Sequence, residues 1–81
     1  MTIRAYVLIE AAVGQGNEVL AALREVPETI QADRVTGPYD VICVFELDDL
    51  DDLGTLVRER IHLIKGIART ISCVAFSWSE P

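Results

Sequence analysis

The residue with the clearest potential for chemistry is Asp40, which follows a Gly-Pro turn in the segment VTGPYDVI at residues 35–42. A carboxylate in a turn between two strands can contact a ligand, or it can cap the turn by accepting a hydrogen bond from a nearby backbone N–H. Gly37 presents the same choice, because tight turns often require a residue with positive φ. From the residue types alone, the structural role is favoured for both.

Three other segments contain residue types found in functional sites, and each has a simpler interpretation. Residues 14–19, GQGNEV, resemble a dinucleotide-binding turn, but Val19 replaces the third glycine and the chain is too short for a doubly wound sheet. Residues 46–52, ELDDLDD, lack the spacing of a calcium loop and suit the positive end of a helix dipole. His62 is expected at the surface near a helix end, with no second histidine to form a zinc site. We therefore predict no catalytic residue, no metal and no cofactor.

The composition is that of one acidic, apolar domain. The 81 residues are 51% hydrophobic, with a formal net charge of -6 and a pI near 4.5, so phosphate backbones and anionic membranes would repel the chain. Its apolar runs are far shorter than a membrane span, and the N-terminus lacks a signal-peptide pattern. Cys43 and Cys73 are expected to be buried, unpaired residues of a reducing compartment. We expect a cytoplasmic protein that binds neither nucleic acid nor membrane directly.

Hydrophobic periodicity divides the chain into two halves, each with a strand, a helix and a second strand. Short runs rich in β-branched and aromatic residues predict strands at 3–10, 30–36, 39–47 and 67–78. Helical spacing predicts one helix that opens at 14–17 and stops before Pro27, and a second over 48–64 that Gly66 caps. The second helix is predicted to bury Leu50, Leu53, Leu56, Val57, Ile61 and Ile64.

The order βαββαβ predicts an α+β fold, the ferredoxin-like sandwich, in which two helices cover one face of a four-stranded antiparallel sheet. The strand at 30–36 alternates as an edge strand would, with Ile30, Ala32 and Arg34 on one side. The strands at 3–10 and 39–47 are apolar on both sides, whereas a solvated face should be polar. The uncovered face is therefore predicted to pack on a second copy, giving a homodimer of the dimeric α/β barrel type. Trp78 is expected to pack at a subunit edge.

The segment VTGPYDVI, the helix after it and the segment IKGIARTISCVAF together resemble the effector-binding (RAM) domain of the Lrp/AsnC, or feast/famine, transcription regulators. The resemblance covers nearly the whole chain, with a departure at 65–67, where Lys-Gly-Ile replaces the usual Pro-Gly-Val. Those regulators also carry an N-terminal helix-turn-helix that reads DNA, whereas here the first predicted strand begins at Ile3. The expectation is a stand-alone effector-binding domain that lacks its own DNA-binding element.

The resemblance implies that dimers assemble into a ring and that an amino acid or similar small molecule binds in clefts between them. A carboxylate suits the α-ammonium group of such a ligand, while backbone N–H groups and hydroxyls suit its α-carboxylate. With the resemblance taken into account, ligand contact is favoured over turn capping for Asp40. Tyr39 is still favoured as a packing residue. The ligand contacts that the resemblance implies are Thr36, Gly37, Tyr39, Asp40, Thr70 and Ser72, with Leu50 as a weaker member. Thr70 and Ser72 could equally be polar residues on the face of a strand.

Two other functions remain open. An enzyme of the dimeric α/β barrel type, such as a small monooxygenase or isomerase, would use the same sheet pairing, and fold alone does not separate it from a binding domain. Such an enzyme needs an acid, base or cofactor ligand in its interior, which is here predicted to be apolar. The chain could also be a structural partner that joins a full-length Lrp/AsnC regulator in mixed rings.

Overall fold

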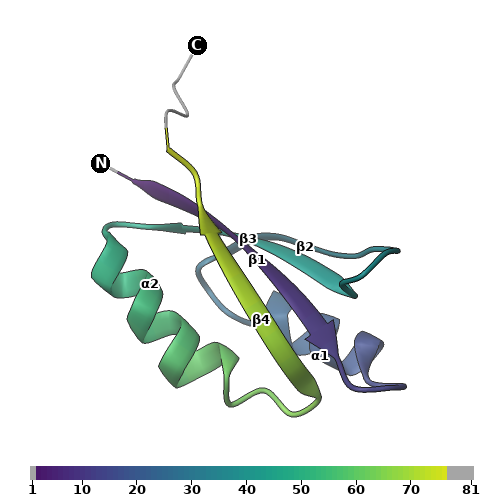
Figure 1. Cartoon of the computed structure of the whole chain (residues 1–81). Coiled ribbons are helices and arrows are strands. Elements are labelled where there is room, and N and C mark those ends of the chain that lie inside the picture. Colours follow the sequence, from purple (N-terminus) through teal and green to yellow (C-terminus); the bar gives the residue numbers. More distant parts are fainter. Residues whose placement is uncertain (1, 77–81) are drawn as a thin grey trace.

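The predicted order of strands and helices is present in the structure, a computed structural model that describes residues 2–76 (Figure 1). This confirms the α+β, ferredoxin-like arrangement. No helix among those residues is long and apolar enough to cross a membrane. In chain order the elements are β1 (Ile3–Ala11), α1 (Gly16–Arg24), β2 (Thr29–Arg34), β3 (Val41–Leu47), α2 (Leu50–Leu56), the π-helix η1 (Val57–Ile61) and β4 (Ile67–Val74).

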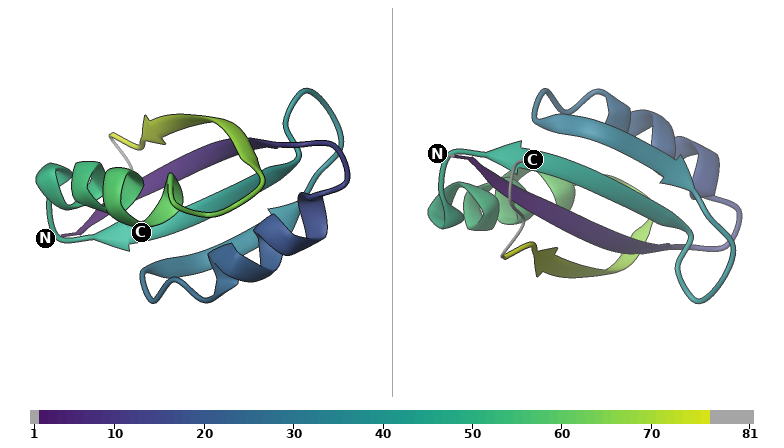
Figure 2. Two further views of the ribbon diagram at one scale, coloured as in Figure 1. Left: turned by 90° about the horizontal axis from the view of Figure 1, so that it is seen from below. Right: turned by 90° about the horizontal axis from the view of Figure 1, so that it is seen from above.

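The strands form one antiparallel sheet in the order β2-β3-β1-β4, with both helices on one side (Figure 2). In the central strand β1, Val7 pairs with Cys43 of β3 and with Ser72 of β4. Helix α1 packs on β2 and β3, and α2 packs on β3. We call the helix side of the sheet the inner face and the opposite side the outer face.

The core lies between the inner face and the two helices. Phe45 and Val7 are 0% exposed, because alternate residues of the two central strands point at the apolar sides of α1 and α2. Helix α1 contributes Val19 and Leu23, and the second helical segment contributes further apolar side chains. The buried members of the core are Ala5, Val7, Ile9, Val19, Leu23, Val26, Ala32, Val41, Cys43, Phe45, Leu47, Leu53, Leu56 and Ile61.

The two cysteines lie in different environments, which corrects one prediction. Cys43 is buried on the inner face, and this burial raises the pKa of its thiol to about 12. Cys73 is exposed, because it lies on the outer face of the edge strand β4, opposite Tyr6. The expectation that both cysteines are buried is therefore wrong for Cys73. Its apolar neighbours in sequence do not cover it, since strand residues alternate between faces.

The second helix begins and continues differently from the predicted span of 48–64. Asp49 is the N-cap, and its side chain accepts a hydrogen bond from the backbone N–H of Asp52 at 3.0 Å, so the acidic segment marks a helix start as predicted. After Leu56 the helix widens into η1, and the His62 N–H donates to the Val57 carbonyl, five residues earlier, at 2.9 Å. Hydrophobic spacing alone does not reveal this widening, because the buried side chains continue on one side.

Two details predicted for the second helix are wrong. Leu50 is 57% exposed and not part of the buried stripe, because it is the first helical residue and lies beyond the end of β3. The C-cap is His62, in an ordinary right-handed conformation, and not Gly66. Gly66 lies in the connection to β4 with φ 99°, where a Cβ would lie 2.9 Å from the Gln15 Cβ. It is needed for both its backbone conformation and its close approach to the segment before α1.

A β-bulge changes the alternation predicted for the second strand. Thr29 pairs with Phe45 and Gln31 with Val44, so the register shifts between them and Ile30 has no partner of its own. Ile30 is 49% exposed while Ala32 is buried. The prediction that these two residues share one side is therefore wrong, because the extra residue breaks the period of two before Ala32.

The other strand ends differ from the predicted ones by a few residues. The strand predicted at 30–36 is Thr29–Arg34, and the one predicted at 39–47 begins at Val41. Residues 35–40 form a longer connection than the Gly-Pro turn alone indicated. Sequence patterns define the ends of a strand less sharply than its centre. Strand β4 ends at Val74. The last part of the strand predicted to reach 78, including Trp78, lies outside the described residues.

Candidate functional site

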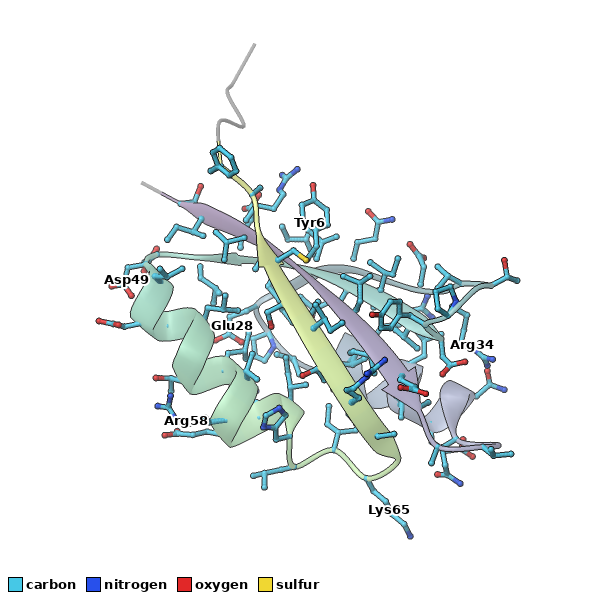
Figure 3. The ribbon with its side chains drawn as sticks, in the orientation of Figure 1. Tyr6, Glu28, Arg34, Asp49, Arg58 and Lys65 are labelled. Carbon is cyan, nitrogen blue, oxygen red and sulfur yellow. The ribbon has the colours of Figure 1, made fainter. Side chains whose placement is uncertain are left out.

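A cavity of about 320 Å³ lies at one end of the sheet, between the loop after β1 and the β2–β3 connection. We call it the end cavity. Figure 3 shows Arg34 at this end of the molecule, beside the start of α1. The walls include Ala11 from the end of β1, Gly14 from the loop after it, Gly16 and Asn17 from the start of α1, and Arg34 and Asp40 from the β2–β3 hairpin. The structure thus places the predicted ligand residue Asp40 in a wall of a cavity.

Asp40 is half-buried and is held against the end of β1. Its carboxylate Oδ2 accepts a hydrogen bond from the Ala11 N–H at 2.8 Å, and its own N–H donates to the Ile9 carbonyl at 2.8 Å. The Val35 N–H donates to the Asp40 carbonyl at 2.9 Å. The side chain therefore has a structural role, although its partner belongs to β1 and not to its own turn. One oxygen is used in this way, so a ligand contact through the same carboxylate stays a prediction.

The other predicted contacts of the β2–β3 connection lie beside the end cavity and are not among its wall residues. Thr36 and Gly37 are exposed, and Tyr39 is half-buried. Gly37 has φ 125°, and no heavy atom lies within 4 Å of a Cβ added there. The backbone conformation alone is therefore enough to require glycine, which supports the turn interpretation.

Thr70 and Ser72 lie on β4, on the far side of β1 from the hairpin. They pair with Ile9 and Val7, which places both on the inner face. Thr70 is nevertheless half-buried and Ser72 is exposed, because the helices pack over the other strands. The Thr70 hydroxyl lies 3.4 Å from His62 Nε2, so His62 contacts a predicted ligand residue, a proximity that sequence reasoning did not detect.

Leu50 lies at the opposite end of the sheet from Asp40. Along the β1–β3 ladder, Val41 pairs with Ile9 and Leu47 pairs with Ile3, so β3 carries the chain from one end to the other over roughly 20 Å. A single subunit therefore does not bring Leu50 and Asp40 together. A ligand that touches both would have to lie between two subunits.

A second cavity, of about 380 Å³, lies near Leu50 at that opposite end, between β3 and α2. Its walls are acidic and include Glu28, Glu46, Asp48 and Glu59, with Arg60 as a cation. Arg60 Nη1 lies 3.9 Å from Glu28 Oε1. Within residues 2–76, no group of three or more His, Cys, Asp or Glu side chains is arranged to hold a metal ion.

Of the wall residues of the end cavity, Asp40 alone was predicted as a site residue, and Gly16, Asn17 and Arg34 are among those that the sequence did not indicate. The sequence predicts an edge strand at Arg34 and a helix start at Gly16 and Asn17. Arg34 Nη1 donates to Asn17 Oδ1 at 2.7 Å, and these residues are 17 positions apart. One feature of the sequence could have indicated that Arg34 belongs to this site: it is a positively charged residue at the end of a strand that leads into the turn containing Asp40.

Comparison with known proteins identifies the family. The model of the family described as "Lrp/AsnC ligand binding domain" matches residues 4–78. The chain belongs to this family. The crystal structure of TTHA0845 from Thermus thermophilus is 32% identical to this Lrp/AsnC domain, covers 98% of each chain and superposes with a TM-score of 0.90.

Transcription regulators are also among the similar proteins. The HTH-type transcriptional regulator Ptr1 of Methanocaldococcus jannaschii is 36% identical over 45 residues, which is 56% of this chain. The Lrp/AsnC domain spans 30% and 39% of the lengths of the two regulators that it matches. The crystal structure of the transcriptional regulator NMB0573/L-Met complex from Neisseria meningitidis has a TM-score of 0.85 and 16% identity, and covers 98% of this chain and 53% of that one. At that identity it shows a shared fold.

Proposed function

We propose that this Lrp/AsnC domain binds a small-molecule effector, an amino acid, and serves in regulation as a homo-oligomer without catalysis. The observation that carries the proposal is Asp40, an acidic wall residue of the end cavity in a chain of the Lrp/AsnC ligand-binding family. Its carboxylate suits an ammonium group. The L-Met complex of the Neisseria regulator, which has the same fold, makes amino acids the first ligands to test.

The outer face supports a homodimer that pairs sheet to sheet. Its centre is apolar, and ion pairs flank it: Arg4 with Glu46 at 2.9 Å towards one end and Arg69 with Glu10 at 3.3 Å towards the other. An apolar centre with a charged rim is the usual anatomy of a protein interface. The apolar centre consists of Tyr6, Leu8, Ile42, Val44, Ile71 and Cys73, which the strand pairing sets side by side.

A ring of such dimers would bring the two ends of different subunits together. Asp40 and Leu50 lie at opposite ends of the sheet, so a contact between dimers offers a way for both to touch one ligand. In mixed rings with a full-length Lrp/AsnC regulator, ligand binding to this domain could influence the binding of the regulator to DNA. The domain itself is expected not to bind DNA specifically, given its net charge of -6.

The ligand is to be sought by thermal shift against the twenty L-amino acids, followed by calorimetry. Asp40→Asn is the informative variant, because the amide oxygen can still accept from the Ala11 N–H while the charge is lost. We expect it to weaken binding by about 1.5 to 3 kcal/mol, which is roughly tenfold to more than a hundredfold. Asp33→Asn, on the exposed part of β2, is the matched control. Equal affinity of Asp40→Asn and the parent would remove Asp40 from the site, and no shift with any amino acid would refute this ligand class.

A further inference from the structure

The end cavity carries opposite charges on two of its walls. Asp40 supplies a carboxylate, and Arg34 supplies a guanidinium. Among residues 2–76, no ion pair within 4.0 Å joins these two groups. The carboxylate and the guanidinium therefore do not neutralise each other, and a ligand that enters between them can contact both.

Arg34 is held in place over the start of α1. Its Nη1 donates to Asn17 Oδ1 at 2.7 Å, which uses one of the five N–H donors of the guanidinium. The group also lies against the backbone of Gly16, where an added Cβ would come within 2.6 Å of Arg34 Cζ and 2.9 Å of both terminal nitrogens. A residue with a side chain at position 16 would have to displace the guanidinium. Glycine there allows Arg34 to lie over the cavity wall.

The two charges decide which ligand chemistry fits. The α-ammonium and α-carboxylate groups of a free amino acid carry opposite charges, so together they match one acidic and one basic wall. A simple anion would be repelled by Asp40 and by the net charge of -6 of the chain. A simple amine, which is a cation, would be repelled by Arg34. A guanidinium also matches the geometry of a carboxylate through two parallel N–H···O bonds.

We propose that Arg34 binds the α-carboxylate of the ligand and is a specificity-determining residue of the end cavity. The inference rests on the proposed function, because it concerns the orientation and selection of an amino acid at that same site. The ammonium end then faces Asp40, and the ligand side chain points out of the cavity towards any neighbouring subunit. Arg34 and Asp40 together select zwitterions over amines, amides and simple acids.

The test compares the amino acid with the largest thermal shift with its own α-carboxamide, in calorimetry on the parent and on Arg34→Gln. The parent should prefer the acid by about tenfold to a hundredfold, because the carboxamide cannot form a charge-assisted bidentate contact. In Arg34→Gln this preference should fall to within about threefold, since only neutral hydrogen bonds remain. Arg58→Gln, an exposed arginine on η1, is the matched control and should retain the parental preference.

A second variant, Gly16→Ala, keeps every charge and tests the position of the guanidinium. Its Cβ would displace Arg34 from the wall, so the preference for the acid should fall in this variant as well. This measurement carries the test if Arg34→Gln does not fold, as judged by circular dichroism. An unchanged preference in folded Arg34→Gln, or in Gly16→Ala when the first variant is unfolded, overturns the role of Arg34 while the proposed function stands. If none of the twenty amino acids binds the parent, the proposed function itself fails, and this inference fails with it.

Discussion

The two faces of the sheet carry similar apolar side chains in very different surroundings. On the inner face Phe45 and Val7 are 0% exposed, whereas on the outer face Tyr6 and Ile71 are 37% and 38% exposed. Val7 and Tyr6 are neighbours in β1 and point to opposite faces of the sheet. The difference arises because α1 and α2 cover one face and leave the other uncovered. The inner face should therefore govern the folding of a subunit, and the outer face should govern association.

The largest effect is expected from a truncation on the inner face. Phe45→Ala removes the largest of the fully buried side chains and leaves a cavity in the core. We expect the free energy of unfolding to fall by about 3–5 kcal/mol, measured by urea denaturation of dilute protein. Tyr6→Ala, on the outer face, should cost about 1 kcal/mol or less in the same experiment. Similar losses for the two variants would contradict the distinction between the faces.

A charge on the outer face should act on association. Ile71 lies beside Leu8 in the apolar centre, so Ile71→Asp would bury a carboxylate between the subunits of a sheet-paired dimer. We expect dimerisation to weaken by about 2 kcal/mol or more, roughly thirtyfold, as measured by sedimentation equilibrium. Ser72→Asp is the control, because its exposed side chain belongs to the inner side of the same strand. A parent that is monomeric at micromolar concentration would disprove sheet pairing.

The buried thiol on the inner face predicts a loss of stability in alkali. The pKa of Cys43 is raised from 9.0 to about 12, first because burial disfavours the thiolate and second because of Asp33. Above pH 9 the unfolded chain loses this proton while the folded chain keeps it, so the stabilisation is complete below pH 9 and decreases from there to pH 12. The slope should approach about 1.4 kcal/mol per pH unit.

This slope can be measured as the difference between the parent and Cys43→Ala in urea denaturation from about pH 8 to about pH 10.5, a range that begins below the ordinary thiol pKa. The subtraction removes the contributions of all other ionisable groups, because the two proteins share them. Parallel profiles would show that the Cys43 thiol ionises as easily in the folded chain as in the unfolded one.

The smallest effect on stability concerns the exposed thiol. Iodoacetamide at about pH 8 should label Cys73 and not Cys43 in dilute protein, because only Cys73 is exposed. Mass spectrometry should then find one label per chain, with a change in unfolding free energy of about 0.5 kcal/mol or less. Since Cys73 belongs to the outer face, its labelling should slow as the protein is concentrated into dimers. Labelling at a rate independent of concentration would indicate that another surface pairs.

Much of the fold could be predicted because its information is local. Alternation in β1 and β3 placed Ala5 and Val7 on one face, and helical spacing found the buried Leu53 and Ile61. Two of the failures come from single-residue irregularities: the bulge at Ile30 and the widened turn of η1 each insert a residue into a regular period. Periodicity detects the mean repeat over a segment and not the position at which one residue is added.

The candidate site was predicted less completely, because its parts are distant in the chain. The sequence alone identified Asp40 as a carboxylate at a hairpin, and it left the choice between turn cap and ligand contact open. Only the tertiary structure showed that its partner is the Ala11 N–H, 29 residues away, and that Arg34 lies over Gly16. Local residue order determines strands, helices and turns through steric preferences and the burial of apolar side chains. Which charges face each other across a cavity depends on how those elements pack, and that packing exists only once the whole sheet has formed.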